Sequence, residues 1–126
     1  MGTFLIADDS PGKMAFLRKH VEKAGWKTIL TAETTEEAKA LIDAHKIDAA
    51  FIDYFIPSEN GAAVIAYLRE KHPSAHLALA TSSESESVAD KAMKAGAERV
   101  ICTSIDERDL IDAVDDLLQE WGAAAR

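Results

Sequence analysis

Five short, mostly apolar runs, each followed by a segment with helical periodicity, restrict the fold of this 126-residue chain more than any other feature. Such runs are typical of strands that are buried on both faces of a sheet. Strands that alternate with helices form a parallel sheet with right-handed crossovers and helices on both faces. The sequence therefore predicts an α/β fold, a doubly wound (βα)5 arrangement with a five-stranded parallel sheet. The predicted strands are residues 3–7, 28–31, 49–52, 77–80 and 99–102.

Local signals mark where the intervening helices begin and end. Ser10 can cap a helix whose first residue is Pro11, and Gly25 ends that helix. Thr34 and Glu37 have capping-box spacing at the start of the second helix. We expect the other helices to begin near Gly61, Ser85 and Asp106, and residues 123–126 to form a frayed tail.

Length, charge and cysteine content narrow the class of protein. The chain is long enough for one buried core, so we expect a single domain over residues 1–126 with no output domain. Its net charge of −8 argues against nucleic-acid binding, because phosphate backbones attract Lys and Arg. The single cysteine, Cys102, excludes an internal disulfide and fits a reducing compartment. No apolar run is long enough to span a membrane and no signal-peptide pattern is present, so we expect a cytoplasmic protein.

Carboxylates and hydroxyls follow the predicted strands at their carboxyl ends, where parallel α/β sheets place functional groups. Asp8 and Asp9 follow the first strand, Asp53 follows the third, and Thr81 follows the fourth. Three carboxylates held within a few ångströms repel one another unless a cation lies among them. Oxygen ligands in an incomplete cage favour a hard ion that keeps several waters, so we predict a Mg²⁺ site.

The same residues indicate a site that accepts a phosphoryl group. Mg²⁺ leaves coordination positions free for a phosphoryl oxygen, and Asp53 can attack phosphorus to form an aspartyl phosphate. The Thr81 hydroxyl can donate a hydrogen bond to that group. The sequence contains no Ser-His-Asp arrangement, zinc-ligand spacing or glycine-rich phosphate loop. We expect the four histidines, on predicted helices or at their ends, to be surface residues: His20, His45, His72 and His76.

Together these motifs resemble the receiver domain of bacterial two-component response regulators, over the whole chain. The resemblance implies a flavodoxin-like fold, with Asp53 as the phosphoacceptor and Thr81 as the hydroxyl residue that couples phosphorylation to the signalling face. It implies Mg²⁺ ligation by Asp9, by Asp53 and by the backbone carbonyl of Phe55, with Asp8 acting largely through water. The matching residues are Asp8-Asp9, Asp53, Pro57, Gly61, Thr81 and Gly96-Ala97.

The resemblance also implies partners and a limited chemistry. The expected partners are a sensor histidine kinase or phosphotransfer protein and a downstream effector protein. The domain is expected not to be an enzyme, apart from self-phosphorylation from a phosphodonor and autodephosphorylation. A homodimer through helix surfaces is compatible with the sequence, although no residue specifies one.

The sequence departs from the family pattern in two places. Receivers nearly always carry a Lys at the end of the fifth strand followed by a cis-proline, but these positions hold Thr103 and Ser104. No other Lys or Arg is near enough in sequence to replace that ammonium through a small register slip. A non-proline cis bond costs about 2.5–4 kcal/mol, so we expect a trans peptide at Ser104 and a reshaped loop. Val100 stands where the family usually has a Tyr or Phe that rotates inward on activation.

Three functional hypotheses follow. In the first, Asp53 is phosphorylated because the acidic trio is present, and the output takes an unusual route. In the second, the domain is a pseudo-receiver that binds partners without phosphorylation, as Thr103 and Val100 suggest. The third, a small-molecule binder of flavodoxin type, is disfavoured because no Ser/Thr/Gly-rich phosphate loop follows the first strand. In the first hypothesis, Tyr54 and Phe55 either shield the phosphoryl group from water or pack locally.

Overall fold

A single sheet of five parallel strands forms the centre of the molecule in the computed structural model, which describes residues 2–124. The strand order is β2-β1-β3-β4-β5, so the predicted flavodoxin-like fold class is confirmed. The sequence places each strand within one or two residues of its observed bounds. The strands are β1 (Thr3–Ala7), β2 (Thr28–Ala32), β3 (Ala49–Ile52), β4 (His76–Thr81) and β5 (Arg99–Cys102).

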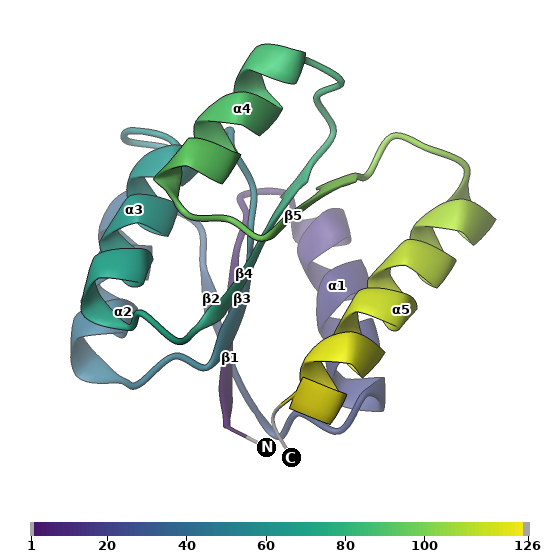
Figure 1. Ribbon diagram of the computed structural model, residues 1–126, viewed down its shortest axis with the longest axis horizontal. Coiled ribbons are helices and arrows are strands. Elements are labelled where there is room, and N and C mark those ends of the chain that lie inside the picture. The colour runs from purple at the N-terminus through teal and green to yellow at the C-terminus, as the bar shows by residue number, and fades with distance from the viewer. Residues whose placement is uncertain (1, 125–126) are drawn as a thin grey trace.

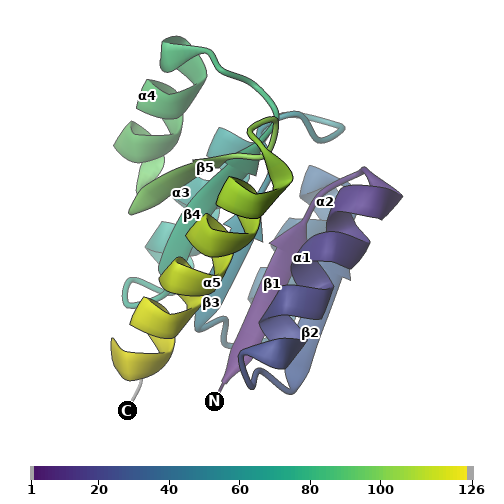
Figure 2. The same cartoon turned by 90° about the vertical axis from the view of Figure 1, so that its right-hand side faces the viewer.

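Five helices connect these strands: α1 (Pro11–Lys23), α2 (Thr35–Ala44), α3 (Gly61–Lys71), α4 (Glu86–Ala95) and α5 (Glu107–Ala124). Helices α1 and α5 cover one face of the sheet, and α2, α3 and α4 cover the other (Figure 1). Figure 2 shows α1 and α5 side by side on their face. Strand β2 lies on one side of β1, and β3 lies on its other side. The order of the strands reverses there, so the switch point lies at the carboxyl ends of β1 and β3.

Side-chain caps fix where four of the helices begin. In each case an oxygen of the capping side chain accepts a hydrogen bond from the backbone N–H three residues later, which satisfies a donor that the helix leaves free. Gly96 ends α4 with a φ of 126°, a conformation that side-chain-bearing residues rarely adopt. The four capping residues are Ser10, Thr34, Asn60 and Ser85.

The alternation of side chains along β1 divides them between two cores. Phe4 and Ile6 pack on the side of α1 and α5, Leu5 and Ala7 pack on the side of α2 and α3, and all four are fully buried. All four residues of β3 are buried as well, as the apolar run predicts. Burying a large apolar side chain contributes about 1.5–3 kcal/mol, so the central strands form a firmly packed base for the residues that follow them.

Helix α5 extends further than the sequence indicates. It continues to Ala124, so the prediction of a frayed tail from residue 123 is wrong for its first two residues, and residues 125–126 lie outside the described part of the chain. The apolar stripe of α5 packs into the core and favours continuation of the helix. Across residues 2–124, no helix combines the length and the apolar character needed to cross a membrane.

Two of the histidines expected at the surface make packing contacts: His20 is buried, and His76, a residue of β4 rather than of a helix, is half-buried. His20 is only 7% exposed, and its Nδ1 lies 2.9 Å from the carboxylate of Asp115 on α5. His76 lies in β4 and stacks on Trp121, with 5.5 Å between the ring centroids. Both partners are distant in sequence, so the local sequence pattern does not indicate these contacts.

Candidate functional site

The register of the central strands brings Asp8 and Asp53 together. Ala7 of β1 is paired with Ile52 of β3, so the residues that follow them emerge side by side at the switch point. The Asp53 N–H donates to the carbonyl of Ala7 at 2.9 Å, and the Asp8 N–H donates to the carbonyl of Ala32 at 2.9 Å. The backbones of both aspartates are therefore fixed by the sheet.

Asp9 completes an acidic trio with these two residues. One carboxylate oxygen from each of Asp8, Asp9 and Asp53 lies within 4.8 Å of the others. Asp8 and Asp53 are 1% and 7% exposed, whereas Asp9 is exposed to solvent. The sequence predicts this grouping, and the two strand ends bring it about.

The buried carboxylates are incompletely satisfied by the protein. Asp8 Oδ1 accepts a hydrogen bond from the Ser10 N–H at 2.9 Å, while Asp53 Oδ1 is buried and has no hydrogen-bond partner among the described residues. Burial raises the pKa of the Asp8 carboxyl above its ordinary value; the Ser10 amide and Lys13 oppose this effect, and the charge of Asp53 adds to it. A buried acceptor without a donor, beside two more carboxylates, fits a divalent cation.

Lys13 is a charged residue at this site that the sequence analysis did not identify. Its Nζ lies 3.0 Å from Asp8 Oδ2 and 3.3 Å from Asp53 Oδ2, and it donates a hydrogen bond to the Ala80 carbonyl at 3.0 Å. The two carboxylate contacts are ion pairs. The family pattern places the expected cation at the end of β5, where Thr103 stands, whereas Lys13 comes from the first turn of α1.

A signal for Lys13 is present in the sequence. Side chains of a helix point back toward its N-terminus, so a long side chain in the first turn of α1 reaches over the strand that precedes it. A cation in that first turn is disfavoured by the helix dipole, and α1 has no acidic residue there to offset it. A lysine three residues after a capping Ser10 and four after Asp9 is therefore a candidate counter-ion for the acidic pair.

Thr81 and Thr103 lie at the ends of the neighbouring strands β4 and β5. Thr81 is 1% exposed, and its hydroxyl oxygen accepts the Ser83 N–H at 3.3 Å, which leaves the hydroxyl proton for another acceptor. The Thr103 N–H donates to the Thr81 carbonyl at 2.8 Å. The Thr103–Ser104 peptide is trans. This is the form expected for Ser104, which replaces the cis-proline of the family.

The residues after Asp53 follow a loop that must pass close to α3. A Cβ on Gly61 would collide with the Asp53 carbonyl oxygen and with the Tyr54 backbone, so only glycine fits this position. Tyr54 packs against the core beneath α3, and its ring contacts that of Phe55, with 5.1 Å between centroids. Phe55 itself is 56% exposed. Tyr54 thus packs locally, while the Phe55 side chain projects into solvent.

Val100 occupies β5 as the sequence predicts, and its side chain is 36% exposed. A valine has no ring to move between an exposed and a buried position, so the aromatic half of the usual receiver switch is missing from this strand.

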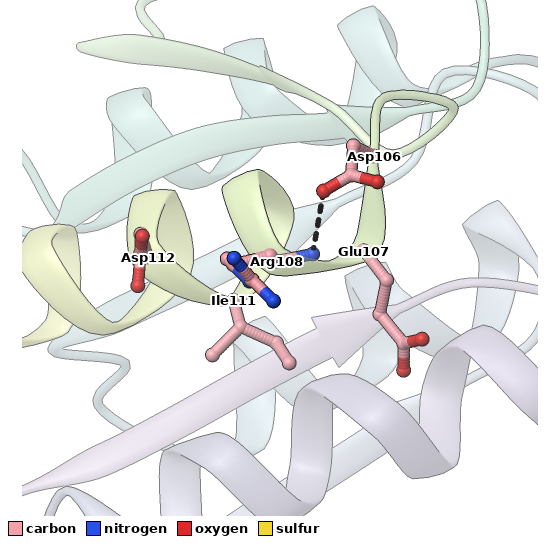
Figure 3. Close-up of a pocket in the computed structure, with 5 residues that line it drawn as sticks. All are labelled: Asp106, Glu107, Arg108, Ile111 and Asp112. Carbon is pink, nitrogen blue, oxygen red and sulfur yellow. Dashed lines mark hydrogen bonds between the residues drawn. The ribbon is translucent and has the colours of Figure 1, made fainter.

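A separate hollow lies at the start of α5 (Figure 3). There the Asp106 carboxylate accepts a hydrogen bond from the Arg108 backbone N–H at 3.2 Å. None of the three site aspartates contributes to it, so we do not assign it to the same chemistry. Its lining residues are Asp106, Glu107, Arg108, Ile111 and Asp112.

Comparisons with known proteins agree with this geometry. The response regulator receiver domain family matches residues 4–115. The photosynthetic apparatus regulatory protein RegA of Rhodobacter capsulatus is 30% identical over 112 residues, which cover 89% of this chain and 60% of RegA. The chemotaxis protein CheY of Halobacterium salinarum is 28% identical over 114 residues, which cover 90% of this chain and 94% of CheY.

A solved structure shows the same fold. It is a response regulator from Burkholderia pseudomallei with a phosphorylated aspartic acid, a calcium ion and citrate, and it matches with a TM-score of 0.78 and 24% identity. The match covers 99% of this chain and 73% of that chain. The family match, the strand order and the acidic trio at the switch point all lead to one assignment. The chain belongs to the response regulator receiver domain family of two-component signalling.

Proposed function

We propose that this domain accepts a phosphoryl group on Asp53 in two-component signalling. The observation that carries the proposal is the Asp53 carboxylate itself: it is 7% exposed, its Oδ1 has no hydrogen-bond partner among the described residues, and it lies beside Asp8 and Asp9. Asp53 has two carboxylate oxygens, so one can bind the metal while the other attacks phosphorus, and no described residue donates a hydrogen bond to Oδ1.

The transfer forms one bond and breaks one bond. An oxygen of Asp53 supplies the electron pair for a new bond to phosphorus, and the donor atom, a histidine nitrogen or the oxygen of a small acyl phosphate, leaves with its bonding pair. The Thr81 hydroxyl would donate a hydrogen bond to a phosphoryl oxygen. The sheet holds the Asp53 backbone through Ala7, so little reorganisation accompanies the attack.

We assign Mg²⁺ to the acidic trio, with Asp9 and Asp53 as direct ligands, Asp8 acting largely through water, and the Phe55 carbonyl as a further ligand. Carboxylate oxygens from two adjacent strand ends are the donors that a hard divalent ion prefers. When bound, the ion would offset the negative charge of the phosphoryl oxygens next to three carboxylates.

The domain acts as a switch rather than as an enzyme with a separate substrate. Its partners in this proposal are a sensor histidine kinase or phosphotransfer protein, which supplies the phosphoryl group, and a downstream effector protein in the cytoplasm. Because Val100 cannot provide the aromatic half of the switch, the output route differs from that of an ordinary receiver. We propose that it involves α4, β5 and α5, with Thr81 at the origin.

A pseudo-receiver is the second candidate, and two observations favour it. Lys13 already forms ion pairs with Asp8 and Asp53, and Thr103 replaces the usual Lys of the fifth strand. In this alternative, the domain binds its partner equally well with and without a phosphoryl group.

Intact mass separates the two candidates. The wild-type protein is incubated with a small acyl phosphate donor and Mg²⁺, beside an Asp53→Asn variant and a sample with a chelator. The proposed function predicts a gain of one phosphoryl group only in wild type with the metal. If wild-type protein gains no phosphoryl group from this donor or from an active histidine kinase, the pseudo-receiver is the correct description.

A further inference from the structure

We propose that Lys13 is the phosphoryl-binding cation of this site, supplied by the first turn of α1 instead of the end of β5. The inference rests on the proposed function for its phosphoryl contact. Its second consequence, competition between the Lys13 ammonium and a divalent metal, does not depend on phosphoryl transfer and can be tested separately.

The contacts of Lys13 extend over three adjacent strand ends. Its ammonium lies 3.0 Å from Asp8 after β1, 3.3 Å from Asp53 after β3, and donates to Ala80 near the end of β4 at 3.0 Å. The side chain is only 14% exposed. Ordering a long lysine side chain costs conformational entropy, and removing its charge from water costs more free energy. The acceptors around the ammonium must offset both costs, so they hold the side chain in this position.

Lys13 and Thr103 also face the same hollow. Both line a pocket between α1 and the loop that joins β5 to α5, with Phe16 on the α1 side and Ile105 on the loop side. Lys13 and the residue at the usual position of the receiver lysine therefore line one pocket. A lysine at position 103 as well would bring a second ammonium group to this pocket.

The position of Lys13 allows its ammonium to contact the carboxylates before phosphorylation and a phosphoryl oxygen afterwards. The ammonium donates one hydrogen bond to the Ala80 carbonyl and forms ion pairs with Asp8 and Asp53. When Asp53 carries a phosphoryl group, the same ammonium can turn a free N–H to a phosphoryl oxygen, which is a stronger, charge-assisted contact. Before that step, Lys13 offsets the carboxylates that would otherwise attract a divalent metal.

These two roles predict opposite effects of one substitution. Lys13→Met keeps the length of the aliphatic stem and removes the charge. Mg²⁺ should bind more tightly to the variant, by about fivefold or more, because a like charge next to its ligands has been removed. Beryllofluoride, which mimics a phosphoryl group on an aspartate, should bind about tenfold or more weakly at saturating Mg²⁺, because its charged donor has been lost.

The control is Lys19→Met. Lys19 lies on the exposed side of the same helix, so this variant has the same change in net charge and the same replacement residue. Lys13→Gln is measured beside it, because it keeps a polar end without charge if the methionine variant does not fold. Calorimetry gives the Mg²⁺ affinity, and fluorine NMR follows beryllofluoride binding. A merely structural role of Lys13 would lower both affinities together or change neither.

The Mg²⁺ titration tests competition between Lys13 and the metal, and the beryllofluoride titration tests the phosphoryl contact. An unchanged Mg²⁺ affinity in both Lys13 variants, or a beryllofluoride affinity equal to that of wild type, overturns the assignment of Lys13. If wild-type protein with Mg²⁺ binds no beryllofluoride, the proposed phosphoacceptor function and the phosphoryl contact of Lys13 are both wrong. A tighter Mg²⁺ site in Lys13→Met would then show that Lys13 is only the counter-ion of the acidic pair.

Discussion

The Lys13 ammonium lies 3.3 Å from Asp53 Oδ2 and joins the first turn of α1 to the carboxyl end of β3. This ion pair places a positive charge beside the proposed phosphoacceptor even though Thr103 occupies the place of the usual receiver lysine. This receiver therefore has a cation at the site although it lacks the fifth-strand lysine. The absence of that lysine does not by itself indicate a loss of activity.

Asp53→Asn should weaken Mg²⁺ binding by about tenfold or more, because the substitution removes one charged oxygen ligand from the acidic trio. Calorimetric titration of wild type and variant measures the change. A matched Asp90→Asn variant, at an exposed position on α4, should leave the affinity as it is. Equal Mg²⁺ affinities in Asp53→Asn and wild type would refute the assignment of the metal site.

Thr103→Lys should strengthen beryllofluoride binding, by up to about tenfold, because it adds a charged donor at the edge of the same hollow that Lys13 lines. The same variant should bind Mg²⁺ more weakly than wild type, since two ammonium groups then compete with the metal. Titration of both ligands tests this pair of effects. No gain in beryllofluoride affinity would mean that the loop after β5 lies too far away for a new ammonium to reach the site.

Asp8 should make the stability of the metal-free protein depend on pH. Because burial raises the pKa of Asp8 in the folded state above its ordinary value of 3.8, the folded protein binds more protons than the unfolded chain between those two pKa values. The contribution of Asp8 to the free energy of unfolding therefore falls as the pH rises between these two pKa values. The destabilisation by the buried charge reaches its full size above the folded-state pKa. The free energy of unfolding of wild type relative to Asp8→Asn should rise as the pH is lowered from neutral in the presence of a chelator. Chemical denaturation at several pH values checks the direction, and a constant difference would contradict it.

Gly61→Ala should destabilise the fold by about 1–3 kcal/mol, because the new Cβ collides with the Asp53 carbonyl oxygen and the loop must move. Gly12→Ala is the matched control: no atom lies within 4 Å of a Cβ at that position of α1, so the substitution should stabilise the protein by up to about 1 kcal/mol. Urea denaturation gives both values. The account of the β3–α3 loop is wrong if Gly61→Ala is as stable as wild type.

Much of the fold and the acidic trio could be predicted from the sequence because both depend on local patterns. An apolar run that ends at Asp53 indicates a buried strand that delivers one carboxylate, and Asp8-Asp9 after the first run adds two more. Parallel strands bring such ends to one edge of a sheet, whatever the details of packing.

Contacts between distant segments could not be predicted in the same way. Lys13 reaches Asp53 and Ala80 only because α1 starts directly above the strand ends, and the burial of His20 depends on Asp115 from the last helix. Helical spacing places Lys13 and His20 on a helix, but it does not give the distance to a residue far along the chain. These contacts follow from the tertiary packing of α1.

Chemical trapping of the phosphorylated residue tests the central claim most directly. Wild-type protein is incubated with a small acyl phosphate donor and Mg²⁺, then reduced with borohydride, which converts an aspartyl phosphate to homoserine, and digested for peptide mass mapping. The account predicts homoserine at position 53 in the treated wild type and at no position in the Asp53→Asn variant. Homoserine at another aspartate, or an unmodified Asp53 in a sample whose intact mass has increased, would contradict it.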